Sequence, residues 1–260
     1  MAKTALITGA SSGIGFELAK IHASKGDNLI LVARSIEKMQ SLKYELESSY
    51  KISVLLIKKD LSLHHAAKEV YDEVKQENIN VDYLINNAGF GDYGMFYETS
   101  WIKEEMMINL NITALTQLTK LFVVDMLANK SGKIMNVAST AAFQAGPTMA
   151  VYYATKAYVL SFSEAIQNEL EGTGITVTAL CPGATESGFM DAANVGESKL
   201  FKGRKLPSSK EVATYGYQAM MEGKTVAIHG FMNRIMAISA QLFPRKMVVK
   251  MTRNIQNKAH

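Results

Sequence analysis

Short runs of apolar residues alternate along the chain with longer stretches in which apolar residues recur every three or four positions. The short runs predict buried strands at 5–8, 29–33, 54–57, 83–86, 133–138, 175–180 and 226–229. The longer stretches predict helices near 13–25, 35–48, 63–77, 101–129, 150–171 and 208–222. Strands separated by helices of this length favour right-handed crossovers. We therefore expect an α/β fold: a doubly wound, mostly parallel sheet with helices on both faces.

No internal repeat, low-complexity tract or linker divides the 260 residues, so the pattern predicts a single domain over residues 1–260. Two segments depart from this alternation of predicted strands and helices. Residues 184–206 lack periodicity and are interpreted as a mobile loop over the substrate. Residues 231–257 mix apolar and basic side chains and predict a C-terminal helical tail. That tail packs on the domain or a partner subunit, or it rests on an anionic membrane surface, the less favoured alternative.

Composition excludes several classes of protein. The chain is 48% hydrophobic and 20% charged, with a net charge of +4, as expected of a globular protein rather than a disordered one. Its basic residues are scattered, which argues against nucleic-acid binding. Cys181 is the only cysteine, so no internal disulfide can form, and a cytoplasmic location is expected. The sequence predicts neither a secretory signal nor a transmembrane helix, and the five histidines lack metal-ligand spacing.

A glycine-rich turn joins the first predicted strand to the first predicted helix. Its sequence is Thr8-Gly9-Ala10-Ser11-Ser12-Gly13-Ile14-Gly15. Backbone N–H groups at a helix N-terminus bind phosphate oxygens, and glycines let the backbone approach the ligand closely. Ser11 and Ser12 can add hydroxyl donors. The turn is therefore interpreted as a pyrophosphate site, although a tight turn without a ligand gives the same pattern.

The ends of the second and third strands bear on the choice of cofactor. Arg34 and Ser35 follow the second strand, where an acidic residue would favour NAD and an arginine favours the 2′-phosphate of NADP. We therefore expect NADP(H), with NAD(H) as the alternative. If Arg34 is only a solvated side chain at the start of a helix, it does not indicate a cofactor preference. Asp60 ends the third strand, where it either accepts a hydrogen bond from the adenine or helps to start the next helix.

Tyr152 and Lys156 are four residues apart in a predicted helix, so they share one face. A nearby ammonium lowers the pKa of a phenol, and a phenol tuned in this way can exchange a proton with an alkoxide. Tyr153 competes for the role because it also lies near Lys156. Taken alone, a tyrosine and a lysine at this spacing are common by chance.

Four further sites follow predicted strands or lie within a predicted helix. Ser139 follows the fifth strand, where its hydroxyl can donate to a substrate oxygen. Asn109 lies within the long predicted helix 101–129, where it either supports a water-mediated proton path from Lys156 or is an ordinary asparagine. Asn86-Asn87-Ala88-Gly89 and Pro182-Gly183-Ala184-Thr185 follow the fourth and sixth strands. Thr185 and Ser187 can orient a nicotinamide, and Cys181 is interpreted as a small buried residue.

Together these motifs resemble the short-chain dehydrogenase/reductase family, over about residues 3–230. The matching segments are TGASSGIG at 8–15, Asp60, NNAG at 86–89, Asn109, Ser139, YYATK at 152–156 and PG at 182–183. The resemblance implies a Rossmann-type fold, the catalytic set Asn109, Ser139, Tyr152 and Lys156, and a dimer or tetramer built through helices 101–129 and 150–171. The segment LVARS resembles NADP-preferring members, and the whole pattern resembles the DltE-like branch. The expected cofactor contacts are Gly9, Ser11, Ser12, Gly13, Ile14, Gly15, Arg34, Ser35, Asp60, Leu61, Asn87, Ala88, Gly89, Tyr152, Lys156, Pro182, Gly183 and Thr185.

The sequence thus predicts an NADP-dependent oxidoreductase that transfers a hydride between the cofactor and a carbonyl/alcohol pair, with Tyr152 as general acid/base. Segments 90–97 and 143–153 favour an apolar substrate pocket, although such residues more often fill the core. One alternative is an NADP(H)-binding sensor or scaffold without turnover. Another is a sugar epimerase or dehydratase, which would need a larger C-terminal substrate domain.

Overall fold

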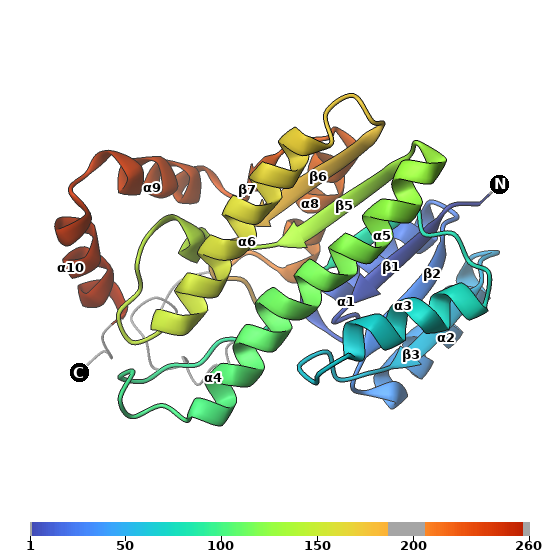
Figure 1. Cartoon of the computed structure of the whole chain (residues 1–260), viewed down its shortest axis with the longest axis horizontal. Helices are drawn as coiled ribbons and strands as arrows, with labels where there is room; N and C mark the ends of the chain where they lie inside the picture. Colours follow the sequence, from blue (N-terminus) through green and yellow to red (C-terminus); the bar gives the residue numbers. More distant parts are fainter. Residues whose placement is uncertain (1, 187–205, 257–260) are drawn as a thin grey trace.

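A single seven-stranded parallel sheet runs through the molecule (Figure 1). The structure is a computed structural model and describes residues 2–186 and 206–256. The strands are β1 (Thr4–Thr8), β2 (Asn28–Ala33), β3 (Val54–Lys58), β4 (Tyr83–Asn86), β5 (Gly132–Val137), β6 (Ile175–Cys181) and β7 (Val226–Ile228). Their order across the sheet is β3-β2-β1-β4-β5-β6-β7, and every pairing is parallel. The predicted doubly wound parallel sheet is confirmed.

Helices cover both faces of this sheet. They are α1 (Gly13–Ser24), α2 (Ile36–Ser49), α3 (Ala66–Gln76), α4 (Trp101–Ile108), α5 (Leu115–Asn129), α6 (Ala150–Glu169) and α8 (Ser209–Met221), with the short turns η1 (Asn109–Ala114) and η2 (Thr140–Phe143). Helices α1 and α8 pack against each other on one face, and α3 packs against α5 on the other. Two separate apolar clusters result, one on each side of the sheet.

The strands alternate their side chains between these two clusters. In β1, Ala5 and Ile7 enter the cluster on the α1 side, whereas Leu6 enters the cluster on the α3 side. All five β1 residues are buried, as expected for the central strand of a parallel sheet covered on both faces. This double burial explains why the predicted strands read as continuous apolar runs.

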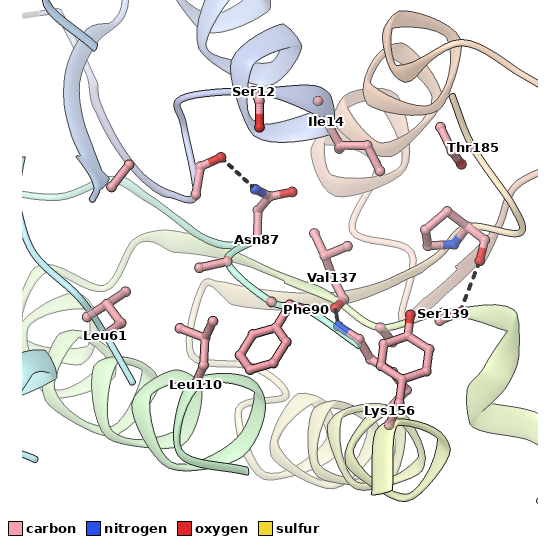
Figure 2. A pocket seen from close by; sticks show the side chains of 18 of the residues that line it. Ser12, Ile14, Leu61, Asn87, Phe90, Leu110, Val137, Ser139, Lys156 and Thr185 are labelled. Carbon is pink, nitrogen blue, oxygen red and sulfur yellow. Dashed lines mark hydrogen bonds between the residues drawn. The ribbon is translucent and has the colours of Figure 1, made fainter. Parts of the chain in front are cut away.

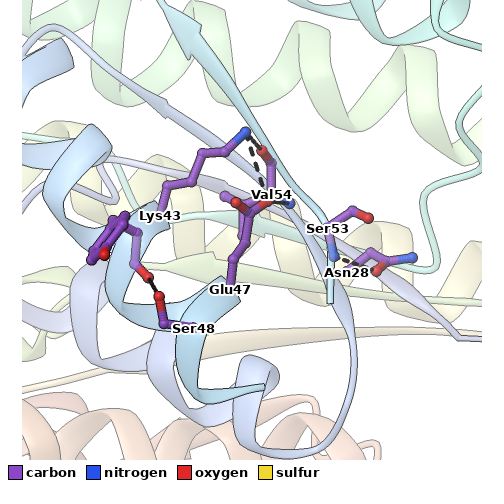
Figure 3. Close-up of polar contacts among 7 residues, drawn as sticks. Asn28, Lys43, Glu47, Ser48, Ser53 and Val54 are labelled. Carbon is purple, nitrogen blue, oxygen red and sulfur yellow. Dashed lines mark hydrogen bonds and ion pairs between the residues drawn. The ribbon is translucent and has the colours of Figure 1, made fainter. Parts of the chain in front are cut away.

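Side-chain hydrogen bonds hold the outer strand β3 to its neighbours (Figure 3). From α2, Lys43 donates to the Val54 carbonyl at 2.6 Å, and Glu47 accepts from the Val54 N–H at 2.8 Å. On the β2 side, the Ser53 N–H donates to Asn28 Oδ1 at 2.9 Å. Because β3 has a neighbouring strand on one side only, these bonds satisfy backbone groups where the strand begins.

The predicted helix 101–129 forms one continuous helical stretch made of α4, η1 and α5 (Figure 1). Trp101–Asn129 is long and apolar enough to cross a membrane by length and composition only, a test that the core helix of a globular domain also passes. In the fold, however, α5 packs against β4, β5 and α3, and α4 packs against α6. Its apolar character therefore serves the core. The middle of the stretch, η1, is a π-helical turn, a feature often found at functional sites.

After β7 the chain forms two helices rather than one tail helix. Helix α9 spans Phe231–Leu242 and α10 spans Arg245–Gln256, and Pro244 separates them. Proline has no N–H to donate, so the first helix ends before it. Both helices lie at one end of the molecule, beyond η2 and α6 (Figure 1). Most of the predicted substrate loop 184–206, including Ser187, lies outside the described residues.

Candidate active site

A cavity of about 500 Å³ opens where the carboxyl ends of β1 and β4 meet. At this point the strand order reverses direction, because β1 leads outward to β2 while β4 leads the other way to β5. Ligands of wound α/β proteins bind at such switch points. The cavity lining draws on loops after β1, β2, β4, β5 and β6 and on α6 (Figure 2). Its volume lies within the range of pockets that bind whole small-molecule ligands and cofactors.

Most of the predicted site residues meet in this one cavity. The lining includes Gly9, Ser11, Ser12, Gly13, Ile14, Arg34, Ser35, Asp60, Leu61, Asn87, Ala88, Gly89, Ser139, Tyr152, Lys156, Pro182, Gly183 and Thr185. Two predicted residues, Gly15 and Asn109, are not among the described lining residues. Segments as far apart in the sequence as Gly9 and Thr185 therefore form one site.

The glycine turn brings the N-terminus of α1 to the cavity. Gly9 has a φ of +66° and Gly13 a φ of +60°, a conformation that residues with a Cβ rarely adopt. Ser12 is the N-cap of α1 but makes no side-chain cap bond. The N–H groups of the first helical turn therefore face the cavity without help from that side chain. Such a turn fits a pyrophosphate, since the N–H groups and the helix dipole both favour an anion.

Gly15 has a packing role instead of a contact role. A Cβ at this position would lie 2.5 Å from the Gly9 carbonyl oxygen and against the Asn87 amide. Gly15 itself is buried. Gly15 therefore allows α1 to approach the preceding turn closely, and it does not line the cavity with the other predicted contact residues.

Asn87 links the loop after β4 to the glycine turn through hydrogen bonds (Figure 2). Its side-chain amide donates to the carbonyls of Thr8 and Gly9, at 2.9 and 3.2 Å. In return, the Thr8 hydroxyl accepts from the N–H groups of Asn87 and Ala88, both at 3.0 Å. The neighbouring Asn86 points into the core, where it donates to Asn136 and Thr119. The asparagine pair thus steadies both the sheet and the cavity floor.

Arg34 stands at the mouth of the cavity after β2. Its side chain is 73% exposed, and its guanidinium lies 3.9 Å from Asp60. The carboxylate of Asp60 also accepts from the N–H and hydroxyl of Ser62, at 3.0 and 2.7 Å. Asp60 therefore organises the turn before α3 while still facing the cavity. Lys38 and Lys59 join Arg34 in the lining, so this end of the cavity is strongly basic and fits a phosphate group.

Ser139, Tyr152 and Lys156 form the polar centre of the cavity. Ser139 follows β5, and its hydroxyl bonds to the Tyr152 phenol, which α6 supplies. Lys156, one turn further along α6, donates to the Val137 carbonyl at 2.7 Å. Its Nζ lies 5.9 Å from the centre of the Tyr152 ring. The three side chains therefore present a hydroxyl, a phenol and an ammonium to one space; Figure 2 shows Ser139 and Lys156 there.

The expected lowering of the Tyr152 pKa is wrong for the protein without its cofactor. Burial raises this pKa to about 12, against a smaller lowering effect of the bond to Ser139. Burial also lowers the pKa of Lys156 to about 8. The Lys156 ammonium donates to the Val137 carbonyl. Burial removes the Tyr152 phenol and the Lys156 amine from water, which disfavours the charged form of each. The spacing within the helix predicted the pair, but it could not predict this desolvation.

Asn111, and not Asn109, stands beside Lys156. The amide of Asn111 donates to the Thr155 hydroxyl and to the Phe90 carbonyl, both at 3.0 Å, and its oxygen accepts from the Phe90 N–H at 3.2 Å. A Cβ at Gly89 would lie 3.0 Å from Asn111 Oδ1 and 3.4 Å from Lys156 Nζ. Asn109 lies two positions earlier in η1, which turns its side chain to a different face.

The sequence held a signal for Asn111 that the assignment to Asn109 missed. The buried positions Met107, Asn111, Ala114 and Leu118 recur every three or four residues along the helix. Asn111 is thus a buried polar residue between the apolar positions Met107 and Ala114. A buried polar side chain needs hydrogen-bond partners, which makes it more informative than a half-exposed asparagine.

Aromatic and methionine side chains line the other end of the cavity. Phe90, Met149 and Tyr153 face it, and they belong to an apolar cluster with Met107 and Tyr93. The last described residue, Gln256 of α10, donates from its side chain to the Tyr153 phenol, while Tyr93 donates to the Gln256 carbonyl at 3.1 Å. The C-terminal helix therefore fixes a wall of the cavity. No local motif pointed to this contact between residues 103 positions apart.

The loop after β6 completes the site. Pro182 accepts a long hydrogen bond of 3.4 Å from Ser139, and Thr185 donates to the Gly183 carbonyl at 3.0 Å. Cys181 is fully buried, and burial raises the pKa of its thiol to about 12. The prediction of a small buried cysteine without a catalytic role agrees with this environment.

Comparison with known proteins agrees with the fold and the site. Residues 3–198 match the short chain dehydrogenase family. A bulky-bulky ketone specific alcohol dehydrogenase from Comamonas testosteroni is 30% identical, with a TM-score of 0.78 over 92% of each chain. A short-chain dehydrogenase from Sphingobium yanoikuyae in complex with NADPH is 29% identical, with a TM-score of 0.83 over 98% of each chain. A structure from Burkholderia phymatum in complex with NAD is 24% identical and shares the fold, with a TM-score of 0.82 over 100% of this chain and 98% of that one.

The sheet order, the glycine turn at the switch point and the Ser139–Tyr152–Lys156 cluster define a Rossmann-type oxidoreductase. More specifically, the chain belongs to the short-chain dehydrogenase/reductase family. Its predicted place in the DltE-like branch stays a prediction.

Proposed function

We propose that this protein is an NADP(H)-dependent reductase or dehydrogenase of a carbonyl/alcohol pair, with Tyr152 as its general acid/base. The observation that carries the proposal is the shared cavity. A glycine turn suited to phosphate and a hydroxyl–phenol–ammonium cluster line the same space, although more than 120 positions separate them in the sequence. A site built only for binding a nucleotide needs no proton donor at its far end.

The residues present fit a pyridine dinucleotide. The glycine turn suits the pyrophosphate, and Arg34 with Lys38 and Lys59 suits a 2′-phosphate, which favours NADP over NAD. When bound, the nicotinamide supplies the hydride. The uncapped N-terminus of α1 and the close approach that Gly15 allows are observations of this fold that support the fit.

The chain's own residues would carry the proton. Ser139 donates toward the oxygen of a bound carbonyl and orients it, while the Tyr152 phenol gives its proton to that oxygen during reduction. A raised pKa keeps Tyr152 protonated and ready to act as an acid. Lys156 returns a proton toward this centre, and Asn111 holds the loop carrying Gly89 and Phe90 beside it.

We propose a bulky, largely apolar carbonyl compound as the substrate. The cavity end next to Tyr152 is lined by Phe90, Met149 and Tyr153, which offer apolar and aromatic surface. The similar enzyme from Comamonas testosteroni is specific for ketones with two bulky substituents, which supports this class.

The decisive experiment measures NADPH oxidation over a panel of ketones and aldehydes. Tyr152→Phe removes the phenol and should lower kcat by about 10²–10⁴-fold, the usual contribution of a positioned proton donor, with NADPH affinity kept. Tyr153→Phe is the matched control, because it removes a neighbouring phenol that also lines the cavity. The proposal fails if Tyr153→Phe abolishes turnover and Tyr152→Phe does not, or if no carbonyl oxidises NADPH.

We also propose that the protein works in the cytoplasm as a homodimer or homotetramer. The faces of α5 and α6 support the assembly, because Val124 and Tyr158 are 59% and 38% exposed there. The single buried cysteine is compatible with a reducing compartment. Light scattering after size-exclusion chromatography tests the assembly, and introduction of a charge by Val124→Glu should dissociate it.

A further inference from the structure

Helix α10 turns polar as well as apolar side chains toward the protein, with Val248 and Val249 partly buried there, and it leaves a row of apolar side chains exposed. Thr252 and Gln256, four residues apart, face the protein and are 8% and 1% exposed. Met247, Met251 and Ile255 lie on the outer face at the same spacing, and they are 43%, 54% and 43% exposed. A helix packed only on its own domain turns its apolar stripe inward. The outer face of α10 therefore lacks the apolar neighbour that its sequence pattern indicates.

Helix α9 continues this outward apolar surface. Its inner side carries Ala237, which is buried, and Asn233, which donates to the His229 carbonyl at 2.8 Å. The exposed apolar side chains of α9 and its following turn are Phe231, Met232, Ile235, Met236, Ile238, Leu242 and Phe243. Scattered exposed apolar residues are normal, whereas a contiguous group of this kind indicates a binding surface.

The charges of this segment all have one sign. No Asp or Glu occurs after Glu222, whereas Arg234, Arg245, Lys246, Lys250 and Arg253 all lie on α9 and α10. None of these five residues has an ion pair among the described part of the chain. On α10, Lys246 and Lys250 flank the row of Met247 and Met251. The surface is thus both apolar and basic.

These observations distinguish between the partners that can cover the surface. A second copy packed through the same face would bring basic residues against basic residues, which is unfavourable. An anionic lipid bilayer satisfies both features at once, since its acyl region takes apolar side chains and its headgroups attract Lys and Arg. Both helices lie at one end of the molecule (Figure 1).

We propose that the outer face of α9 and α10 docks on an anionic lipid bilayer as an in-plane amphipathic anchor. The sequence favoured packing on the domain or on a partner subunit over membrane contact, but Met247, Met251 and Ile255 of α10 are left exposed. The inner side of the same helix reaches the cavity, where Gln256 bonds Tyr153. The docking face and the apolar end of the cavity are therefore joined through one helix.

The test is co-sedimentation of the purified full-length protein with vesicles. We expect binding to phosphatidylcholine–phosphatidylglycerol vesicles at low salt and weaker binding at high salt, with little binding to phosphatidylcholine alone. Lys246→Glu/Lys250→Glu should weaken binding at least tenfold, because each basic residue near an anionic surface contributes a substantial attraction. Met247→Ser/Met251→Ser should also weaken it, through lost apolar insertion.

Lys25→Glu/Lys51→Glu is the matched control, because it makes the same change in net charge at exposed lysines that follow α1 and α2. This control should keep more than half of the binding. The proposal is overturned if no vesicle binds the protein, or if the control loses as much binding as Lys246→Glu/Lys250→Glu. It is also overturned if Met247→Ser/Met251→Ser turns an oligomer into monomers that bind vesicles unchanged. None of these readouts depends on turnover, so they stand apart from the proposed reaction.

Discussion

Lys156 provides a direct test of the electrostatics of the cavity. The ammonium is 5% exposed, and burial lowers its pKa from the ordinary 10.5 to about 8. At pH 7 the lysine is protonated in both the folded and the unfolded state, so the folded protein carries the whole cost of the buried charge. That cost is about 3 kcal/mol of unfolding free energy. Replacement by Met keeps most of the side-chain volume and removes the charge.

Removal of the charge in Lys156→Met should stabilise the folded protein, but loss of the hydrogen bond to Val137 opposes that effect. Its 2.7 Å contact is lost in Lys156→Met, at a cost of about 1–2 kcal/mol. The charge effect is the larger of the two. We therefore expect Lys156→Met to be about 1–2 kcal/mol more stable than the parent at pH 7 while losing turnover. A residue that lowers stability and is still present indicates a functional demand on that position.

The pH dependence has a defined sign. Between pH 8 and pH 10.5 the unfolded state binds more protons at Lys156 than the folded state, so stability of the parent rises with pH. The advantage of the variant should therefore shrink by about 1.4 kcal/mol between pH 7 and pH 9. Urea denaturation of the cofactor-free proteins, followed by circular dichroism at both pH values, measures it.

A matched control is Lys120→Met on the exposed side of α5, which should change stability by less than about 0.5 kcal/mol. The reasoning is refuted if Lys156→Met is less stable than the parent at pH 7. A stability difference that stays constant between the two pH values would also refute it, because the charge would then have no part in the effect.

The remaining predictions concern the cofactor and the scaffold of the site. Arg34→Ser should weaken NADPH binding by about tenfold or more relative to NADH, through loss of charge-assisted hydrogen bonds; titration with both cofactors measures it, and equal losses would contradict the assignment. Asn111→Ala should cost about 1–3 kcal/mol in a denaturant titration, whereas Asn109→Ala should cost less than about 0.5 kcal/mol; the reverse ranking would restore Asn109. Gly15→Ala should lower the melting temperature and NADPH affinity together, because its Cβ meets the Gly9 carbonyl; an unchanged protein would show that the turn can shift.

Hydrogen bonds between loops and helices hold both ends of the cavity in place. The β1 and β4 loops are tied together by Asn87 and Thr8, so the phosphate end of the site is held by short hydrogen bonds. At the other end, Asn111 ties η1 to α6 through Thr155. Both ends therefore rest on the sheet and its helices.

The sequence alone predicted the sheet and helices closely. The β4 boundaries agree residue for residue, and β1 begins only one residue before its predicted start. This success has a physical reason: strands buried on both faces must be continuously apolar, and helices that cover a sheet must carry an apolar stripe. The glycine turn and the pair Tyr152 and Lys156 were also readable, because each depends on local spacing within one element.

Only the tertiary structure decided the features that depend on contacts between distant segments. The choice of Asn111 over Asn109 depends on a π-helical turn and on Thr155, a neighbour 44 positions away. The pKa of Lys156 depends on burial by the whole cavity, and the wall formed by Gln256 depends on where α10 lies. Hydrophobic periodicity shows which face of a helix is apolar, but the partner of that face is fixed by three-dimensional packing. For α10, the three-dimensional packing leaves apolar side chains exposed on the outer face.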